Sequence, residues 1–546
     1  MKVRSGASVA GDSATSAVWT LASRVTGFAR VLLIGAVLGP SYFGNLFQLG
    51  NQLPWLAFDL AIGALLGSLL VPALVRHVSK GDAAAVERIA NGFLGLVVTA
   101  FAGIVIVVMA ASGLIAEGFA LPITDAQVHS DFVAAAVPLL LLTAPQLVGY
   151  GIAITGQAVQ QAMGHYRLPA AASIVENVVV CATLAVFAVV FGFGVELADV
   201  TTLHILMLGG GSSLGVVLHA GLQLWGVRSL GIKIRPTAGW RDPDVKSLLR
   251  QALPTSGTAL LNGCRLITLL TISNTVPGGV VAFQLALNIL NVPVALGAKP
   301  VVHALLPRLS RAYSSNDTAE FSERYLRGVG FAFLITAPAA AAVVSLGWLV
   351  SSGLAVGEMG TDNGRRLLAF GIAGVGGAIL GDGLYHLSSA ASYSRLDPFG
   401  PLQAQVLRFG GTVLGAASTL AWVDGSASIL GLALSMSAAD LLAAWYLHRR
   451  VSATLSTGDY NLSTSMARTL SCSMFGFGAA GIIGWWAVRG WSLSPIVSLA
   501  AVAGLGGAGL ALYVGTRLKL DHELATLFSE VRNRNVTANE TVKAAT

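Results

Sequence analysis

The sequence has too little charge for a soluble protein of its size. Only 11% of its 546 residues are Asp, Glu, Lys or Arg, whereas 54% are hydrophobic. A soluble domain carries about a quarter charged residues, and the mean hydropathy here is +0.73. The composition therefore excludes a soluble globular protein and predicts an all-α integral membrane protein with many spans.

The chain also lacks the patterns that usually mark catalytic, nucleotide and metal sites. Its three cysteines (Cys181, Cys264 and Cys472) lie in apolar segments and indicate neither a disulfide framework nor a metal cluster. There is no G-x-x-x-x-G-K-[ST] phosphate loop and no Ser/His/Asp constellation. We therefore expect no enzyme activity, no cofactor and no bound metal. Asp242-Pro243-Asp244 has a spacing found in metal-dependent sugar-nucleotide enzymes, but its place before a helix favours helix capping.

Long apolar stretches occur along almost the whole chain. About 20 apolar residues suffice to cross a bilayer as a helix, and the sequence offers fourteen such candidates. They cover residues 15–38, 44–75, 89–112, 131–160, 168–192, 202–226, 247–275, 279–305, 325–350, 365–391, 399–422, 426–447, 466–488 and 492–516. The first span follows a short polar start without a cleavage pattern, so we expect it to be retained.

The distribution of charge predicts the topology. Most of the 33 Lys and Arg residues fall in loops and tails that share one side of the membrane, whereas the other loops carry acids such as Glu117, Asp125 and Glu196. Positive loops face the cytoplasm, so both termini are predicted to be cytoplasmic. The net charge of +7 follows from this topology and does not indicate a nucleic-acid partner.

Two arginines, Arg24 and Arg30, lie inside the first predicted span. An arginine at mid-membrane depth costs roughly 2.5–3.5 kcal/mol on insertion scales, so a functional reason is expected. A polar cavity that holds an anion is the usual one. Asp59 could pair with either arginine, as a structural salt bridge or as a coupling site. Lys299 lies near a span end, where it could extend to the membrane surface or help a phosphate to enter.

The two halves of the chain resemble each other at an offset of 235 or 236 residues. Phe47-Gln48-Leu49 returns as Phe283-Gln284-Leu285, and Arg265 occupies the position that corresponds to Arg30. Polar residues line one face of the second and eighth spans: Asn45, Gln48, Gln52 and Asp59, then Gln284, Asn288 and Asn291. These faces indicate a shared water-filled chamber, although helix packing explains single Ser, Thr and Gly positions better.

The repeat predicts two parallel six-helix lobes. The predicted organisation is an N-terminal lobe (1–226), a cytoplasmic linker (227–246), a second lobe (247–447), a helix pair (448–516) and a polar cytoplasmic tail (517–546). Further ionisable residues within spans could form a proton or cation relay, but local pairing is favoured for them. They are Glu176, Asp382, His386 and Asp440.

With these residues in view, the chain resembles the MurJ/MviN family of lipid-linked oligosaccharide flippases, within the multidrug/oligosaccharidyl-lipid/polysaccharide exporter superfamily. The resemblance rests on Ser23-Arg24-Val25-Thr26-Gly27-Phe28-Ala29-Arg30, on Gln52-Leu53-Pro54 to Leu70-Val71-Pro72, and on Leu305-Leu306-Pro307-Arg308-Leu309-Ser310-Arg311-Ala312. It implies two lobes around a cationic cavity, a helix pair that forms a groove for the lipid tail, and alternating access. It also implies the bacterial cytoplasmic membrane. The chain departs from charged positions of the family at Asn45, Gln52, Ile62, Leu287 and Asn288.

The leading hypothesis is a carrier that flips a polyprenyl-(pyro)phosphate-linked glycan, either lipid II of peptidoglycan or another envelope precursor. Arg24, Arg30 and Arg265 would bind the pyrophosphate. The sugar would contact Asn45, Gln48, Gln52, Gln284, Asn288 and Asn291. Candidate partners are the glycolipid, membrane lipids and cell-envelope synthesis proteins. A drug or cation antiporter, a membrane glycosyltransferase and a transport-dead assembly scaffold remain as alternatives.

Overall fold

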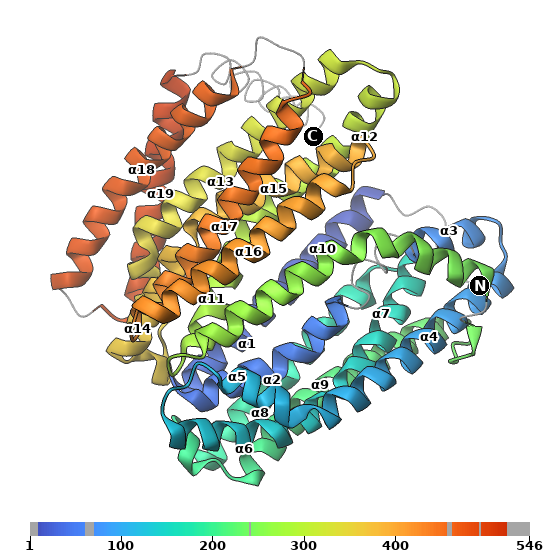
Figure 1. Cartoon of the computed structure of the whole chain (residues 1–546), viewed down its shortest axis with the longest axis horizontal. Helices are drawn as coiled ribbons and strands as arrows, with labels where there is room; N and C mark the ends of the chain where they lie inside the picture. The colour runs from blue at the N-terminus through green and yellow to red at the C-terminus, as the bar shows by residue number, and fades with distance from the viewer. Residues whose placement is uncertain (1–8, 61–69, 240–241, 456–460, 491–492, 521–546) are drawn as a thin grey trace, which may run out of the picture. The chain divides into compact units, whose positions relative to one another are not determined.

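The computed structural model describes residues 9–60, 70–239, 242–455, 461–490 and 493–520, and these residues form helices joined by short connections (Figure 1). The helices, in chain order, are α1 (Val9–Leu38), α2 (Tyr42–Phe58), α3 (Val71–Ser79), α4 (Ala83–Ala110), α5 (Ser112–Ala120), α6 (Ala126–Thr143), α7 (Gln146–Ala162), α8 (Arg167–Phe191), η3 (Leu197–Asp199), α9 (Thr202–Ser229), α10 (Pro243–Ser273), α11 (Gly279–Pro293), η5 (Val294–Ala298), α12 (Lys299–Ser314), α13 (Thr318–Leu354), η6 (Gly357–Gly360), α14 (Asp362–Gly374), α15 (Gly376–Ser394), α16 (Phe399–Trp422), α17 (Ala427–Ser452), α18 (Leu462–Gly490) and α19 (Pro495–Leu520). The all-α prediction is confirmed for this part of the chain.

Eleven helical segments among the described residues are long and apolar enough to span a membrane, so the multi-pass architecture is confirmed and the count of fourteen is not. Each of the fourteen predicted spans contains helix, and eleven of them coincide with these apolar segments; the other three are not tested in full by the described residues or are less apolar. The second predicted span is described only in part, with α2 ending at Phe58, and the apolar stretch found in the described part of α10 is Gly257–Ser273. Helix α16 is less apolar because it includes Gln403, Gln405 and Arg408.

Proline interrupts two segments that the sequence alone presents as single spans. Helices α6 and α7 meet at a turn that contains Pro145. Helices α11 and α12 are joined by a π-helical turn over Val294–Ala298, with Pro293 before it and Pro300 after it. A proline has no N–H to donate and its ring displaces the preceding carbonyl, so the regular hydrogen-bond ladder cannot continue through it.

The chain divides into two compact units. The first comprises Met1–Asn288, Ala355–Gly371 and Pro401–Ala439, and the second comprises Ile289–Leu354, Ile372–Gly400 and Asp440–Thr546. These bounds differ from the predicted lobes, because α10 and most of α11 belong to the first unit. The lobe division at residues 226 and 247 therefore stays a prediction.

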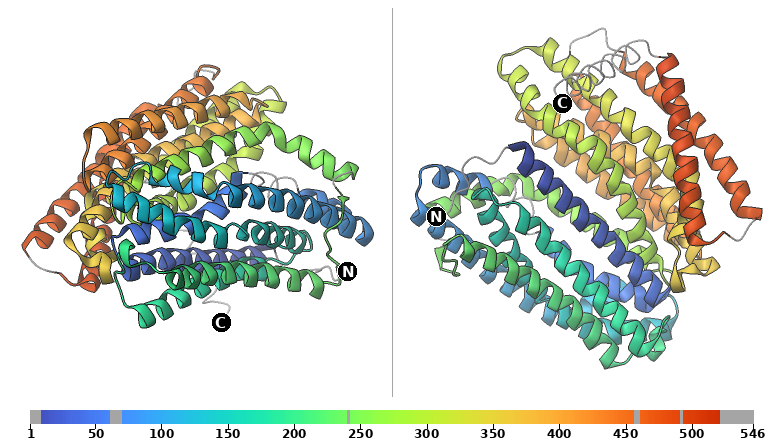
Figure 2. Two further views of the ribbon diagram at one scale, coloured as in Figure 1. Left: turned by 60° about the horizontal axis from the view of Figure 1, so that its bottom comes forward. Right: turned by 180° about the vertical axis from the view of Figure 1, so that it is seen from behind.

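Close helix contacts in the first unit depend on glycine. A Cβ atom on Gly151 of α7 would lie 2.4 Å from Val97 of α4, and one on Gly211 of α9 would lie 2.3 Å from Thr183 of α8. Small residues allow helix backbones to approach closely within a membrane, where dispersion contacts replace the hydrophobic effect. This packing brings α7, α8 and α9 together (Figures 1 and 2).

In the second unit, α18 and α19 lie side by side as the red pair of Figures 1 and 2 and pack against α13. A Cβ atom on Gly481 of α18 would lie 2.7 Å from the side chain of Ser345 of α13. The Tyr513 hydroxyl of α19 donates a hydrogen bond of 2.9 Å to the Leu334 carbonyl of α13. The helix pair predicted near the end of the chain is therefore present and anchored on α13.

Candidate functional site

Arg30 of α1 takes part in a buried polar cluster in the first unit. Its Nη1 lies 3.6 Å from Oε1 of Glu176 on α8. The same carboxylate accepts a hydrogen bond of 2.9 Å from the Tyr150 hydroxyl of α7, and its Oε2 lies 2.9 Å from His219 Nδ1 of α9. We call Arg30, Tyr150, Glu176 and His219 the Glu176 cluster. Four helices thus supply one residue each.

The Glu176 cluster compensates the negative charge of Glu176 but leaves donor capacity unused. A buried carboxylate is tolerated when it is paired and hydrogen-bonded, and Glu176 is 9% exposed. Within the described residues, Arg30 Nε and His219 Nε2 are buried and have no hydrogen-bond partner. A guanidinium offers five N–H donors. Arg30 can therefore donate to a second anion.

Asp59 could have paired with Arg24 or Arg30, but neither ion pair forms among the described residues, and Glu176 is the acidic partner of Arg30. Asp59 caps the C-terminus of α2 and is exposed. Glu176 pairs with residues of neighbouring helices, which agrees with the local pairing favoured for it over a proton or cation relay. No sequence pattern indicated Tyr150 or His219, apart from their being polar residues in apolar segments.

Arg24 has a different environment from Arg30. It is exposed, and no ion pair or hydrogen bond joins its side chain to another residue in the described part of the chain. At 3.6 residues per turn, the two arginines lie about 120° apart around α1. Arg24 is thus an accessible cation and Arg30 a partly paired, half-buried one.

The small residues Ser23, Thr26 and Gly27, beside and between the two arginines, serve helix packing. Ser23 Oγ lies 2.9 Å from Ser173 Oγ on α8. Asn177 Nδ2 donates to Thr26 Oγ1 at 3.1 Å and to the Ser23 carbonyl at 3.3 Å. A Cβ atom on Gly27 would meet the Asn177 side chain at 3.5 Å. The packing interpretation of these positions is confirmed, and it explains how α1 is held against α8.

Asn45 of α2 was expected to contact a sugar, but its side chain forms structural hydrogen bonds instead. Its Nδ2 donates to Asn274 Oδ1 at 2.9 Å and to the Val276 carbonyl at 2.8 Å. Its Oδ1 accepts from the Val280 N–H at 3.0 Å. The residue is fully buried. Asn45 therefore fixes the connection between α10 and α11, and its amide hydrogens are already used.

Gln48 and Gln284, which the repeat pairs with each other, keep polar atoms that no described residue satisfies. Gln48 is 1% exposed, and neither its Oε1 nor its Nε2 has a hydrogen-bond partner within the described chain. Gln284 is 8% exposed and its Oε1 has none. A buried amide without partners costs free energy, so these two side chains are the best candidates among the predicted sugar contacts.

The other predicted site residues are distributed over both units. In the first unit, Gln52 and Asn288 are half-buried, and Arg265 is 7% exposed and engaged with other groups. In the second unit, Asn291 and Lys299 are exposed. Their convergence on a single chamber therefore stays a prediction.

The Asp-Pro-Asp motif caps a helix, as expected. Asp242 Oδ1 accepts from the Asp244 N–H at 2.8 Å at the start of α10. Arg88 of α4 donates to the carboxylates of both aspartates. Partial burial alone would raise the pKa of Asp242, but the hydrogen bonds from Arg88 and the Asp244 backbone hold that pKa below its usual range. No group of three or more potential metal ligands occurs among the described residues.

Replacing Asp242 with Ala is expected to destabilise the protein by about 1–2 kcal/mol, because the helix cap is lost. Asp244→Ala is the matched control, since it removes a contact of Arg88 but leaves the cap. Because the pKa of Asp242 is lowered, its contribution is present above about pH 4 and is lost as the pH falls through the folded-state pKa. Thermal unfolding in detergent measures both effects. A rise in wild-type Tm with added Mn²⁺ that Asp242→Ala abolishes would contradict the capping role.

Comparisons with known proteins agree with this architecture. Residues 34–497 match the family described as "Lipid II flippase MurJ". The chain is 27% identical over 338 residues to a probable lipid II flippase MurJ of Rhizobium tropici, covering 61% of this chain and 60% of the relative. It is 26% identical over 339 residues to the lipid II flippase MurJ of Burkholderia cenocepacia, covering 60% and 61%. The matched region thus spans about three-fifths of these curated relatives.

Solved structures share the fold. A structure described as "Lipid II flippase MurJ, inward closed conformation" matches with a TM-score of 0.72 and 15% identity, over 93% of this chain and 99% of that chain. An inward-facing multidrug transporter of the MATE family matches with a TM-score of 0.62 and 17% identity, over 79% and 95%. Since the family match covers well over half of the sequence, this chain belongs to the lipid II flippase MurJ family of membrane transporters.

Proposed function

We propose that the protein flips a polyprenyl-linked glycan with a phosphate or pyrophosphate headgroup, of which lipid II is the leading candidate, from the inner to the outer leaflet. Family membership supports this proposal, as do the names of its relatives. The observation in the structure that carries it is Arg30, a half-buried guanidinium with an unpartnered Nε and one long contact to Glu176.

Arg30 is suited to an exchange of anionic partners. Its Nη1 contacts Glu176 at 3.6 Å, which is longer than the 2.7–2.9 Å of a strong charge-assisted hydrogen bond. A pyrophosphate could accept two parallel N–H bonds from the guanidinium and compete with Glu176. Tyr150 and His219 would still stabilise the released carboxylate. Arg30 can thus bind a headgroup without leaving Glu176 unpaired.

The remaining predicted contacts are assigned according to their surroundings. Arg24 is exposed and would meet the headgroup first. Gln48 and Gln284 would donate to and accept from sugar hydroxyls, because their buried amides lack partners among the described residues. Arg265, Gln52, Asn288, Asn291 and Lys299 remain proposed contributors. Asn45 is omitted because its amide is engaged in the fold.

The proposed mechanism is alternating access by two lobes in a bacterial cytoplasmic membrane. The eleven apolar segments support a multi-pass arrangement. Fourteen spans with both termini in the cytoplasm agree best with the charge distribution. The helix pair α18 and α19 would line a groove for the polyprenyl tail, as the family resemblance implies. Cell-envelope synthesis proteins are the proposed partners.

The proposal is tested by reconstitution with a fluorescent polyprenyl-pyrophosphate sugar whose outer-leaflet fraction is read with an impermeant quencher. Arg24→Gln is expected to lower the apparent affinity about tenfold, because one charge-assisted hydrogen bond is lost, and to leave Tm unchanged, because Arg24 is exposed. Arg366→Gln, another exposed arginine, is the control for the same charge change. If the wild type does not flip the lipid, the proposed function is contradicted. If Arg24→Gln and Arg366→Gln flip it equally well, the role of Arg24 is contradicted.

A further inference from the structure

A basic cleft lies between α12 and α13, entirely within the second unit and apart from the Glu176 cluster. It encloses about 980 Å³. The charged residues that line it are Arg308, Arg311, Glu320, Glu323, Arg324 and Arg327. Four arginines and two glutamates give the cleft a net charge of +2. No residue predicted to contact the transported substrate lines this cleft.

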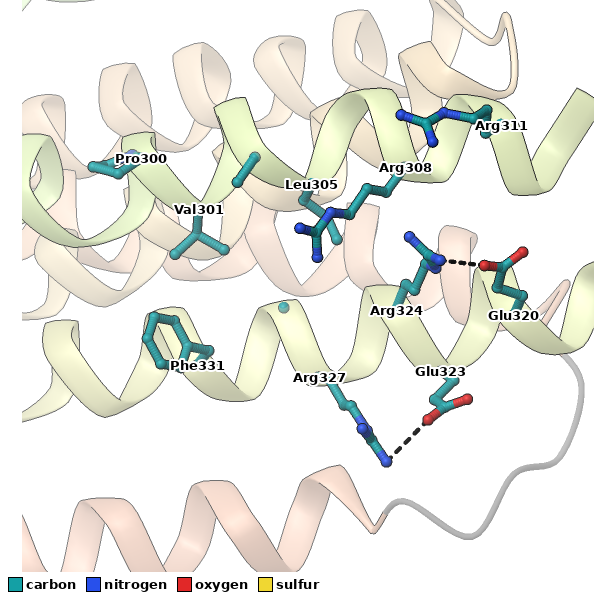
Figure 3. A pocket seen from close by; sticks show the side chains of 12 residues that line it. Pro300, Val301, Leu305, Arg308, Arg311, Glu320, Glu323, Arg324, Arg327 and Phe331 are labelled. Carbon is teal, nitrogen blue, oxygen red and sulfur yellow. Dashed lines mark hydrogen bonds and ion pairs between the residues drawn. The ribbon is translucent and has the colours of Figure 1, made fainter. Parts of the chain in front are cut away.

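The two glutamates are occupied by arginines of their own helix. Glu320 forms an ion pair with Arg324 one turn later on α13. Glu323 pairs with Arg327 at 2.9 Å in the same register. Figure 3 shows both pairs along α13, with the guanidinium of Arg324 directed toward α12. Pairs at this spacing are common on helix surfaces, and they leave α13 with little net charge.

Arg308 and Arg311 of α12 supply the excess positive charge. No ion pair or hydrogen bond joins either side chain to another described residue, and both are exposed. In Figure 3 the Arg308 guanidinium projects from α12 into the space above α13. Two arginines on consecutive turns of one helix can bind the oxygens of one phosphate. The charged part of the cleft is therefore complementary to a phosphate group.

The other part of the cleft is apolar. Pro300, Val301 and Phe331 line it, and Phe331 is 57% exposed. The helices approach closely at its floor, where a Cβ atom on Gly328 would lie 2.6 Å from Leu305. From Pro300 to Arg311 the axis of α12 runs about 16 Å, close to the half-thickness of about 15 Å of a hydrocarbon core. A soluble phosphate compound would leave this apolar surface uncovered.

We propose that the cleft binds an anionic phospholipid, with the phosphate on Arg308 and Arg311 and an acyl chain along Val301 and Phe331. Basic pockets between membrane helices commonly bind acidic headgroups on the cytoplasmic side. In the proposed topology the turn between α12 and α13 lies on that side. The lipid is a resident ligand of the second unit, and its binding does not require that the protein flip a glycan.

Native mass spectrometry of the full-length protein in mild detergent tests the proposal. The probes are phosphatidylglycerol and phosphatidylcholine with identical chains. The wild type is expected to prefer phosphatidylglycerol, and Arg308→Gln/Arg311→Gln to weaken its binding about thirtyfold, given the usual contribution of two arginines near an anionic surface. Arg308→Lys/Arg311→Lys keeps the charge and should retain part of the preference. Arg365→Gln/Arg366→Gln is the matched control, because it removes two exposed adjacent arginines elsewhere.

Four results would overturn the proposal. The first is an unchanged preference for phosphatidylglycerol in Arg308→Gln/Arg311→Gln. The second is an equal loss in Arg365→Gln/Arg366→Gln, which would indicate a nonspecific effect of charge. The third is full displacement of the lipid by millimolar glycerol 3-phosphate, and the fourth is equal binding of dihexanoyl and long-chain phosphatidylglycerol. Either of these two would indicate a site for a soluble phosphate. If Arg308→Gln/Arg311→Gln does not fold, Arg308→Lys/Arg311→Lys provides the test. Complete loss of the preference for phosphatidylglycerol in this variant, which keeps both charges, would contradict the proposed phosphate site.

Discussion

Arg30→Gln is expected to lower the flipping rate at low substrate concentration by about a hundredfold, because two charge-assisted hydrogen bonds to the headgroup are lost. The residue also pairs with Glu176, so its removal leaves a buried carboxylate with only Tyr150 and His219. Breaking one side of a buried pair destabilises a protein by up to about 3–5 kcal/mol. Activity per folded molecule must therefore be measured together with Tm.

The double variant Arg30→Gln/Glu176→Gln separates transport from stability. It removes both charges, and the new amide at position 176 can still bond to Tyr150 and His219. We expect a Tm above that of Arg30→Gln and flipping as low as in Arg30→Gln. Glu176→Gln alone keeps the guanidinium and should still flip. If the double variant recovers flipping along with Tm, Arg30 serves only the structure.

Asn45→Leu is expected to destabilise the protein and Gln48→Met is not, although the two residues lie one turn apart on α2. Leu at position 45 leaves the Val280 N–H and Asn274 Oδ1 without partners, whereas the Val276 carbonyl keeps its hydrogen bond from the Gly279 N–H. Each buried group left unsatisfied costs about 1–3 kcal/mol, so we expect the free energy of unfolding to fall by about 3–5 kcal/mol. Gln48 has no partner to lose among the described residues, so Met should be neutral or stabilising by about 1–2 kcal/mol.

Thermal unfolding in detergent, with Asn45→Leu and Gln48→Met measured in parallel, gives the comparison. The flipping assay then adds a second criterion for Gln48. Because Gln48 is a proposed sugar contact, Gln48→Met should lower the flipping rate while Tm stays the same or rises. Stability and function are often separated in this way at a binding site. A fall in Tm similar to that of Asn45→Leu would show that the Gln48 amide has a structural role.

The helical architecture could be predicted because it depends on local composition. Apolar runs of about 20 residues are visible in the sequence, and each predicted span contains helix. The number of membrane-spanning segments was harder to predict from the sequence. Polar residues such as Arg408 reduce the apolarity of α16, so this predicted span is not among the eleven apolar segments of the described chain. A proline such as Pro145 divides one span into two helices without changing the number of spans. The two contact units also depend on tertiary packing, which the internal repeat does not specify.

The site was predicted in part, and the missing part is non-local. Arg30 could be identified from its own segment, because a guanidinium within an apolar span is energetically costly and therefore indicates a function. Its partner Glu176 is on α8, and nothing near Arg30 in the sequence indicates which of several acids packs against it. Asn45 and Gln48 show the same limit. Both are polar residues on one face of α2, but only the packing of α2 against the α10–α11 connection gives Asn45 its hydrogen bonds.

The pairing of Arg30 with Glu176 also constrains the order of events during synthesis. The ribosome completes α1 roughly 140 residues before it completes the middle of α8. At about 5–20 residues per second, this delay lasts on the order of ten seconds. For that time the nascent first helix carries Arg24 and Arg30 without the carboxylate, which makes it a poor candidate for release into lipid. We expect α1 to stay beside the translocon, or at the membrane surface, until α8 emerges and the two insert together.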